Sequence, residues 1–338
     1  MSIVLCLLIQ AQKYKQMSIQ STIQRFHPSG KFFLLLGLFL FCLGIASMIQ
    51  MLIILPFSGL QLKDLADEQN LALLQDFSNP NIIKGMKIAQ AVSVLFAFII
   101  PSFLFAYYSS EKKFFSLKMN IGFKMVSGIV VVILVFGLMP LINWTGELNS
   151  QLSFPDFMSG IENWMKASEE NLKKLTEAFL QMSGIDDLIV NIIIVGLLAA
   201  IGEELLFRGC MQNVLLEWTK NKHAAVWITA ILFSALHAQF YGFLPRMLLG
   251  VVLGYLYIWS GSLWLSMLFH FLNNGLTVLF AYLIDKGIIA EEAETIGAGE
   301  TPMYYILVSA VVSAGLMYFV YSHRIKPELT STEVPLQE

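Results

Sequence analysis

Long runs of apolar residues, separated by shorter polar stretches, dominate the pattern of this chain. A helix needs about 20 apolar residues to cross the roughly 30 Å hydrocarbon core of a bilayer. Such runs lie near residues 32–56, 85–108, 121–144, 187–216, 223–240, 245–260, 262–284 and 302–322. The pattern therefore predicts an all-α fold, a polytopic transmembrane helical bundle of about eight membrane helices.

The composition supports a membrane protein. Of the 338 residues, 57% are hydrophobic and only 13% are charged, which is too apolar for a water-soluble domain of this size. Cys6, Cys42 and Cys210 lie in or beside apolar segments at unrelated spacings, so they indicate neither a disulfide framework nor a metal cluster. Because no basic patch is present, the expected partners are the lipid bilayer and a membrane-associated substrate, with no nucleic acid.

The distribution of charge between the predicted helices indicates their orientation, because basic residues near helix ends mark the cytoplasmic side. Every second polar segment carries them: Lys13, Lys15, Arg25 and Lys31, then Lys112, Lys113 and Lys118, then Lys220 and Lys222, then Arg324 and Lys326. The alternate loops, 57–84, 145–187 and 285–301, hold 17 of the 24 acidic residues. Both termini are therefore expected in the cytoplasm. The expected location is a bacterial inner membrane, since no organelle-retention signal is recognised.

The chain divides into five segments. They are a cytoplasmic N-terminal segment (1–31), three N-terminal membrane helices (32–144), an extracytoplasmic loop with an amphipathic helix (145–186), a core (187–284), and the last membrane helix with the C-terminal tail (285–338). The apolar run from Ile3 to Ile9 lacks the preceding basic residues and the following cleavage site of a secretory signal. Met17 offers a second start position besides Met1.

The loop 145–186 contains apolar residues at spacings of three and four, which predict an amphipathic helix. They are Ile161, Trp164, Met165, Ala167, Leu172, Leu175, Phe179 and Met182. Two alternatives are open at this point: the helix lies on the membrane surface, or it caps a cavity.

Ionisable residues inside predicted membrane helices are the strongest indication of function, because each costs a few kcal/mol at the centre of a bilayer. The span 187–216 contains Glu203, Glu204 and Arg208, the span 223–240 contains Phe233 and His237, and the span 262–284 contains His270 and Asn274. Since residues four apart share a helix face, Glu204 is expected to pair with Arg208, and His270 is expected to lie beside Asn274. Glu203 is turned about 100° away and is free for another role.

The depth of these residues can be counted from the turn at Lys220–Lys222. At 1.5 Å per residue, Glu203 and His237 both lie roughly 22–26 Å from that turn, so their side chains can meet. A carboxylate, two imidazoles and an amide at similar depth form a polar pocket that can hydrolyse an amide bond.

The three stretches resemble the motifs of the CAAX prenyl protease and bacteriocin-processing family, the CPBP or ABI superfamily, which includes the Ras-converting prenyl endopeptidase. The Glu-Glu-x-x-x-Arg, Phe-x-x-x-His and His-x-x-x-Asn motifs match at Glu203, Glu204 and Arg208, at Phe233 and His237, and at His270 and Asn274. The resemblance covers residues 187–284. It implies an intramembrane endopeptidase in which Glu203 and His237 activate water, His270 and Asn274 form the oxyanion hole, and Glu204, Arg208 and Phe233 support the site.

Several alternatives accompany this interpretation. A site without cofactor is favoured, but Glu203, His237 and His270 could instead bind zinc with a fourth position open. The same pocket could serve a non-enzymatic bacteriocin-immunity or scaffold protein. A proton relay in a transporter is less favoured, because the chain shows no repeated halves. The expected substrate is a peptide or protein in or at the membrane, and whether it is CAAX-like or prenylated is open.

Overall fold

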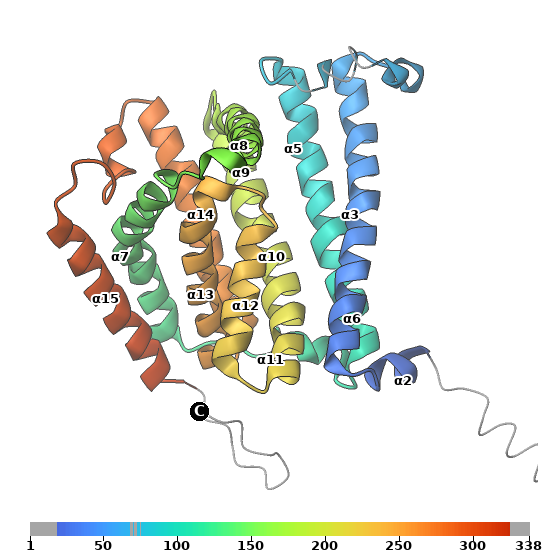
Figure 1. The fold of residues 1–338 in the computed structure, drawn as a ribbon, viewed down its shortest axis with the longest axis vertical. Coiled ribbons are helices and arrows are strands. Elements are labelled where there is room, and N and C mark those ends of the chain that lie inside the picture. Colours follow the sequence, from blue (N-terminus) through green and yellow to red (C-terminus); the bar gives the residue numbers. More distant parts are fainter. Residues whose placement is uncertain (1–18, 68–69, 71–72, 75, 325–338) are drawn as a thin grey trace, which may run out of the picture.

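The computed structural model describes residues 19–67, 70, 73–74 and 76–324, and these form a bundle of helices (Figure 1). Within the described ranges there is no strand, only an isolated bridge between Ile296 and Ala298. The predicted all-α fold is confirmed. The run Ile3–Ile9, Met17 and the C-terminal tail lie outside the described residues.

Seven helical segments of the described chain are long and apolar enough to cross a membrane. They are α3 (Pro28–Ser58), α5 to α6 (Pro80–Ser109), α7 (Met125–Ser150), α9 to α11 (Ile185–Thr219), η7 to α13 (Phe240–Ser260), α14 (Leu263–Asp285) and α15 (Met303–Ser322). Shorter helices are α2 (Ile19–Gln24), η1 (Leu62–Ala66), η3 (Lys113–Leu117), η4 (Asp156–Met158), α8 (Ser159–Leu180), α12 (Lys222–Ala235) and η8 (Glu291–Ala293).

The fourth of these segments is a composite helix. It consists of α9 (Ile185–Asn191), the π-helical η5 (Ile192–Leu198), α10 (Ala199–Glu204), the π-helical η6 (Leu205–Gln212) and α11 (Asn213–Thr219). Because π-helical turns are frequent at functional sites, their position on both sides of α10 indicates that this short element has a functional role.

The fifth predicted span, residues 223–240, is wrong in length. Its helix α12 has 14 residues and ends at Ala235. The His237 side chain explains the early end, because its Nδ1 donates to the Phe233 carbonyl at 2.7 Å, the group that the His237 backbone N–H would bind in a continuing helix. The chain then turns at Ala238, which has a positive φ of 51°. The chain still crosses the bundle at this point, through α12 and the loop that follows it.

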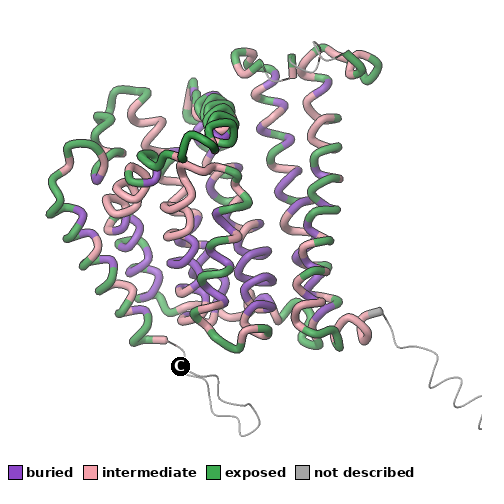
Figure 2. Tube along the Cα trace, viewed as in Figure 1, coloured by how far each residue is buried: buried purple, intermediate pink, exposed green. Residues whose placement is uncertain are grey.

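The helices form two packed groups around buried residues (Figures 1 and 2). The first joins the N-terminal helices α3 and α6 to η6, α11 and α12, through buried residues such as Leu35, Phe105 and Phe207. The second joins α7 and α15 to α13 and α14. Helices α10 to α14 therefore lie between the N-terminal helices on one side and α7 with α15 on the other.

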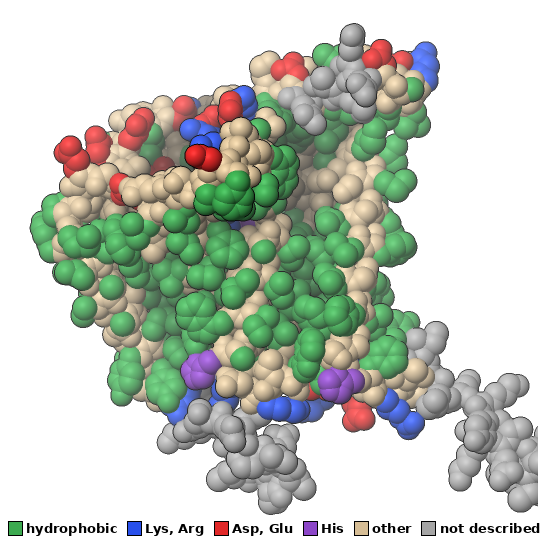
Figure 3. All heavy atoms as spheres, viewed as in Figure 1, with side chains coloured by type: hydrophobic (Ala, Val, Ile, Leu, Met, Phe, Trp, Pro, Cys, Tyr) green, Lys and Arg blue, Asp and Glu red, His purple; other side chains and the backbone are tan. Residues whose placement is uncertain are grey.

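Charged residues gather at the two ends of the bundle, with apolar side chains covering the flank between them (Figure 3). The end where α2 begins the described chain and α15 ends it carries mainly Lys and Arg (Figures 1 and 3). The opposite end carries most of the Asp and Glu, together with some Lys such as Lys166 and Lys174 of α8. The distribution matches the alternation seen in the sequence. We call these the basic end and the acidic end.

Helix α8 lies across the acidic end of the bundle (Figure 1). Its Trp164 ring packs on Phe240 with centroids 5.5 Å apart, and Glu169 accepts a hydrogen bond from the Tyr241 backbone at 3.4 Å. The predicted amphipathic helix is confirmed, with Met165 and Ala178 buried on its inner face. Because Phe240 and Tyr241 follow His237 closely, α8 covers the loop that leads out of α12.

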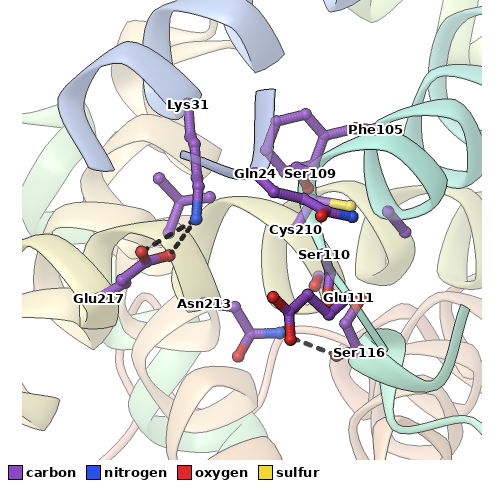
Figure 4. A pocket seen from close by; sticks show the side chains of 13 residues that line it. Gln24, Lys31, Phe105, Ser109, Ser110, Glu111, Ser116, Cys210, Asn213 and Glu217 are labelled. Carbon is purple, nitrogen blue, oxygen red and sulfur yellow. Dashed lines mark hydrogen bonds and ion pairs between the residues drawn. The ribbon is translucent and has the colours of Figure 1, made fainter. Parts of the chain in front are cut away.

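The junction between the N-terminal helices and the core contains a polar cavity of about 330 Å³ at the basic end (Figure 4). Lys31 of α3 and Glu217 of α11 form an ion pair across it, with Nζ 3.0 Å from Oε1. The cavity shares no residue with the His and Glu cluster described below. The ion pair therefore connects the N-terminal helices to the core away from that cluster.

Two glycines allow α12 and α13 to approach closely. A Cβ atom on Gly250 would lie 3.0 Å from the Ala230 backbone, and one on Gly254 would lie 2.9 Å from Val226. Small residues at such contacts are typical of helix packing in membranes, where dispersion forces replace the hydrophobic effect. Gly250 and Gly254 are therefore contact residues between α12 and α13.

Replacing Gly250 with leucine should therefore separate α12 from α13. The Gly250→Leu variant is expected to lose about 1–3 kcal/mol of stability or more, because the side chain has no room beside the Ala230 backbone. Thermal unfolding in detergent, followed by size-exclusion chromatography, measures the effect. Gly44→Leu on α3 is the matched control, since a Cβ at Gly44 meets nothing within 4 Å. Equal stability of the two variants would contradict the packing described here.

Candidate active site

The centre of the bundle contains a buried ion pair on the composite helix. Arg208 Nη1 lies 2.7 Å from Glu204 Oε1, and both side chains are fully buried. Arg208 Nη2 donates to the Gly250 carbonyl of α13 at 3.1 Å, and the guanidinium lies over the Phe233 ring of α12 at 4.7 Å. The predicted pairing of Glu204 with Arg208 is thus present, and it connects three helices.

His270 of α14 binds the same carboxylate oxygen. Its Nδ1 lies 2.9 Å from Glu204 Oε1, and since a carboxylate only accepts, Nδ1 is the donor. This bond fixes the ring so that Nε2 faces Glu203 Oε2 at 3.7 Å. The Glu204 carboxylate therefore orients the His270 imidazole toward Glu203.

His237 approaches Glu203 from the other side. Its Nδ1 donates to the Phe233 carbonyl, so Nε2 is free, and Nε2 lies 4.0 Å from Glu203 Oε2. The His237 ring also packs on the Phe233 ring, with centroids 4.9 Å apart. The structure thus brings together Glu203 of α10, His270 of α14 and His237 of the turn that follows α12.

The position of Glu203 is fixed by the close packing of its helix. A Cβ atom on the preceding Gly202 would lie 2.6 Å from Val94 and 3.1 Å from Phe98, so only glycine permits this contact with the N-terminal helices. The Glu203 side chain is 17% exposed, whereas Glu204 has no exposure. Adjacent residues therefore differ in role, with one carboxylate open to the cavity and the other sealed in the core.

These side chains line a cavity of about 170 Å³. The lining comprises Glu203, Phe233, His237, Arg246, Leu249, Leu253, Phe269, His270, Asn273 and Asn274. We call it the catalytic cavity. Asn274 lies in its wall but makes no bond to His270; its Nδ2 donates to the Val195 carbonyl at 3.2 Å, and Asn273 donates to its Oδ1 at 3.2 Å.

Arg246 of α13 and Asn273 of α14 also line the cavity, and sequence reasoning missed both. Arg246 Nη1 donates to the Gln239 backbone carbonyl at 3.4 Å, and Nη2 bonds the Gln239 side chain. Arg246 could have been found, because it is the one charged residue within the predicted span 245–260. Asn273 carried no such indication, since a single amide beside Asn274 is also compatible with packing.

The three residues named as possible zinc ligands are spaced more widely than the donors of a zinc site. Donor atoms around a tetrahedral zinc at 2.0–2.1 Å lie about 3.3 Å apart. Here the Nε2 atoms of His270 and His237 lie 3.7 and 4.0 Å from Glu203 Oε2. Among the described residues no group of three His, Cys, Asp or Glu is arranged to hold a metal ion.

Comparison with known proteins places the cluster within a recognised segment. Residues 185–276 match the sequence model of a family described as type II CAAX prenyl endopeptidase Rce1-like. The match contains all three motifs, and it confirms the resemblance for this part of the chain. The N-terminal helices and α15 lie outside it.

Two bacterial relatives match over shorter stretches. An uncharacterised protein of Bacillus subtilis (strain 168), YpbD, is 33% identical over 88 residues, which are 25% of this chain and 42% of the relative. An uncharacterised 24.3 kDa protein of Escherichia coli is 36% identical over 112 residues, 31% of this chain and 50% of the relative. The chain thus matches half or less of the length of these curated relatives. No solved structure matches it.

Removing one partner of the buried ion pair should destabilise the protein more than removing both. Arg208→Met leaves Glu204 charged in the core and is expected to cost about 3–5 kcal/mol. The double variant Glu204→Leu with Arg208→Met should recover part of that loss, although it also frees His270. Thermal unfolding of both variants in the same detergent gives the comparison. If the double variant were the less stable of the two, pairing with Glu204 would not be the main way in which Arg208 stabilises the protein.

Proposed function

We propose that this protein is an intramembrane endopeptidase whose catalytic residues are Glu203, His237, His270 and Asn274. One observation carries the proposal: a partly exposed carboxylate lies between the free Nε2 atoms of two imidazoles in a cavity inside the bundle. The match of residues 185–276 to the prenyl endopeptidase family supports a protease.

The reaction begins with a water molecule held by Glu203 and His237. Glu203 accepts a proton from the water as its oxygen attacks the scissile carbonyl carbon, while the His237 Nε2 lone pair accepts the second water hydrogen as a hydrogen bond. The tetrahedral intermediate then collapses. The C–N bond breaks, and the leaving nitrogen takes the proton from Glu203, so the carboxylate is regenerated.

The negative oxygen of the intermediate needs hydrogen-bond donors. Asn274 uses one amide N–H on the Val195 carbonyl, which leaves the second for the substrate. His270 already donates through Nδ1 to Glu204, so Nε2 donates only when the ring carries a proton on both nitrogens. Arg246 supplies a further cation in the cavity wall, and its guanidinium has donors beyond those that bind Gln239.

The proposed orientation places both termini and the basic end in the cytoplasm of a bacterial cell. The substrate is then a membrane-associated peptide or protein. The cavity walls include both apolar residues, such as Leu249 and Phe269, and polar ones, so they are compatible with a prenylated or an unmodified substrate. Cleavage of farnesylated and plain peptides distinguishes the two.

Glu203→Gln should abolish turnover while leaving the protein folded. Glutamine keeps the shape of the side chain but does not take a proton, so cleavage is expected to fall by about 10²–10⁴-fold. The measurement is cleavage of a quenched fluorescent peptide library, with farnesylated CAAX-like members, by detergent-solubilised protein. Glu300→Gln, on an exposed loop, is the control and should cleave normally. Full cleavage activity of a folded Glu203→Gln variant would refute the proposed role of Glu203. Absence of cleavage by the wild type, together with retained binding of a peptide, would favour an immunity or scaffold protein.

A further inference from the structure

A narrow slot adjoins the catalytic cavity. It has a volume of about 140 Å³ and lies between α7 and α14, with walls that include Leu138, Ile142, Leu276 and Phe280. Leu249 and Asn273 line both the slot and the catalytic cavity, so the two spaces are neighbours. We call this space the side slot. A substrate lying across Glu203 can place one of its side chains there.

The lining of the side slot includes one acidic residue, Glu294. Glu294 follows η8 in the loop between α14 and α15, and it lines the side slot but not the catalytic cavity. Asn143 of α7 holds this loop in place, because its Nδ2 donates to the Glu294 backbone carbonyl at 2.7 Å and to the Ile296 carbonyl at 3.0 Å. The backbone at Glu294 is therefore anchored to the wall of the slot.

The Glu294 carboxyl group has no cation to balance it. No described Lys, Arg or His side chain forms an ion pair with it, and partial burial raises its pKa above the usual range. Its neighbours Glu291 and Glu292 are exposed to solvent instead. A partly buried carboxylate beside apolar walls is stabilised when a cation enters and pairs with it. The slot thus has the chemistry of a receptor for a long apolar stem that ends in a positive charge.

We infer that the side slot binds a lysine or arginine side chain of the substrate, with its methylene stem against α7 and α14 and its charge at Glu294. The inference rests on the proposed peptidase function and adds a preference to it. The slot adjoins the cavity that contains Glu203, so the basic residue lies close to the bond that is cut. Nothing in the catalytic motifs encodes this preference.

The test uses detergent-solubilised full-length protein and a set of quenched fluorescent peptides. The peptides carry lysine, norleucine or glutamate at each position in turn; norleucine keeps the apolar stem without the charge. Cleavage is measured for the wild type, and binding is measured by fluorescence anisotropy with the inactive Glu203→Gln protein. Glu294→Gln and Glu294→Lys are compared with Glu292→Gln, the matched exposed control.

We expect lysine to exceed norleucine by about tenfold in kcat/KM at one position near the cut, as for a hydrogen bond to a charged partner. Glu294→Gln should remove that ratio, Glu294→Lys should favour glutamate instead, and Glu292→Gln should retain the lysine preference. Cleavage with no lysine preference, or with one that survives Glu294→Gln, overturns the side-slot inference while the peptidase function stands. If peptides bind in a Glu294-dependent way but are not cleaved, the side-slot inference stands and the peptidase function is overturned. Neither binding nor cleavage of any member overturns both.

Discussion

A single carboxylate oxygen, Glu204 Oε1, holds the centre of this structure together. It accepts hydrogen bonds from Arg208 at 2.7 Å and from His270 at 2.9 Å. Through Arg208 it also reaches the Gly250 carbonyl and the Phe233 ring, so one buried anion connects the composite helix with α12, α13 and α14. A buried charge is tolerated only when it is paired and hydrogen-bonded. Glu204 Oε1 meets that condition, whereas Glu204 Oε2 and Arg208 Nε are buried without a hydrogen-bond partner among the described residues.

The orientation of the two imidazoles follows from this arrangement. Each imidazole has its Nδ1 occupied by a fixed acceptor, the Glu204 carboxylate for His270 and the Phe233 carbonyl for His237. Each therefore presents Nε2 to Glu203, whose carboxylate remains accessible. Glu203 and Glu204 are thus neighbours in sequence but differ in burial. The Glu203 side chain is 17% exposed and accessible, whereas the Glu204 side chain has no exposure and stabilises the fold.

Much of this could be predicted from the sequence. Apolar runs predicted the helices, helical spacing predicted the Glu204–Arg208 pair, and counting residues from the Lys220–Lys222 turn placed Glu203 near His237. The length of α12 could not be predicted, because its end depends on a bond from the His237 side chain to its own helix. The contact of His270 with Glu204 was also missed, since it joins residues 66 positions apart and spacing along one helix says nothing of it. Glu294 lies in a loop whose position is set by Asn143 of a distant helix.

We propose that Glu203, and no metal ion, activates the water. This is tested by the rate of peptide cleavage before and after exhaustive chelation, with the metal content of the same samples determined by mass spectrometry. We expect an unchanged rate in protein that has lost its divalent metals. A rate that disappears on chelation and returns with added zinc would contradict it, and would mean that Glu203, His237 and His270 move together to bind the ion.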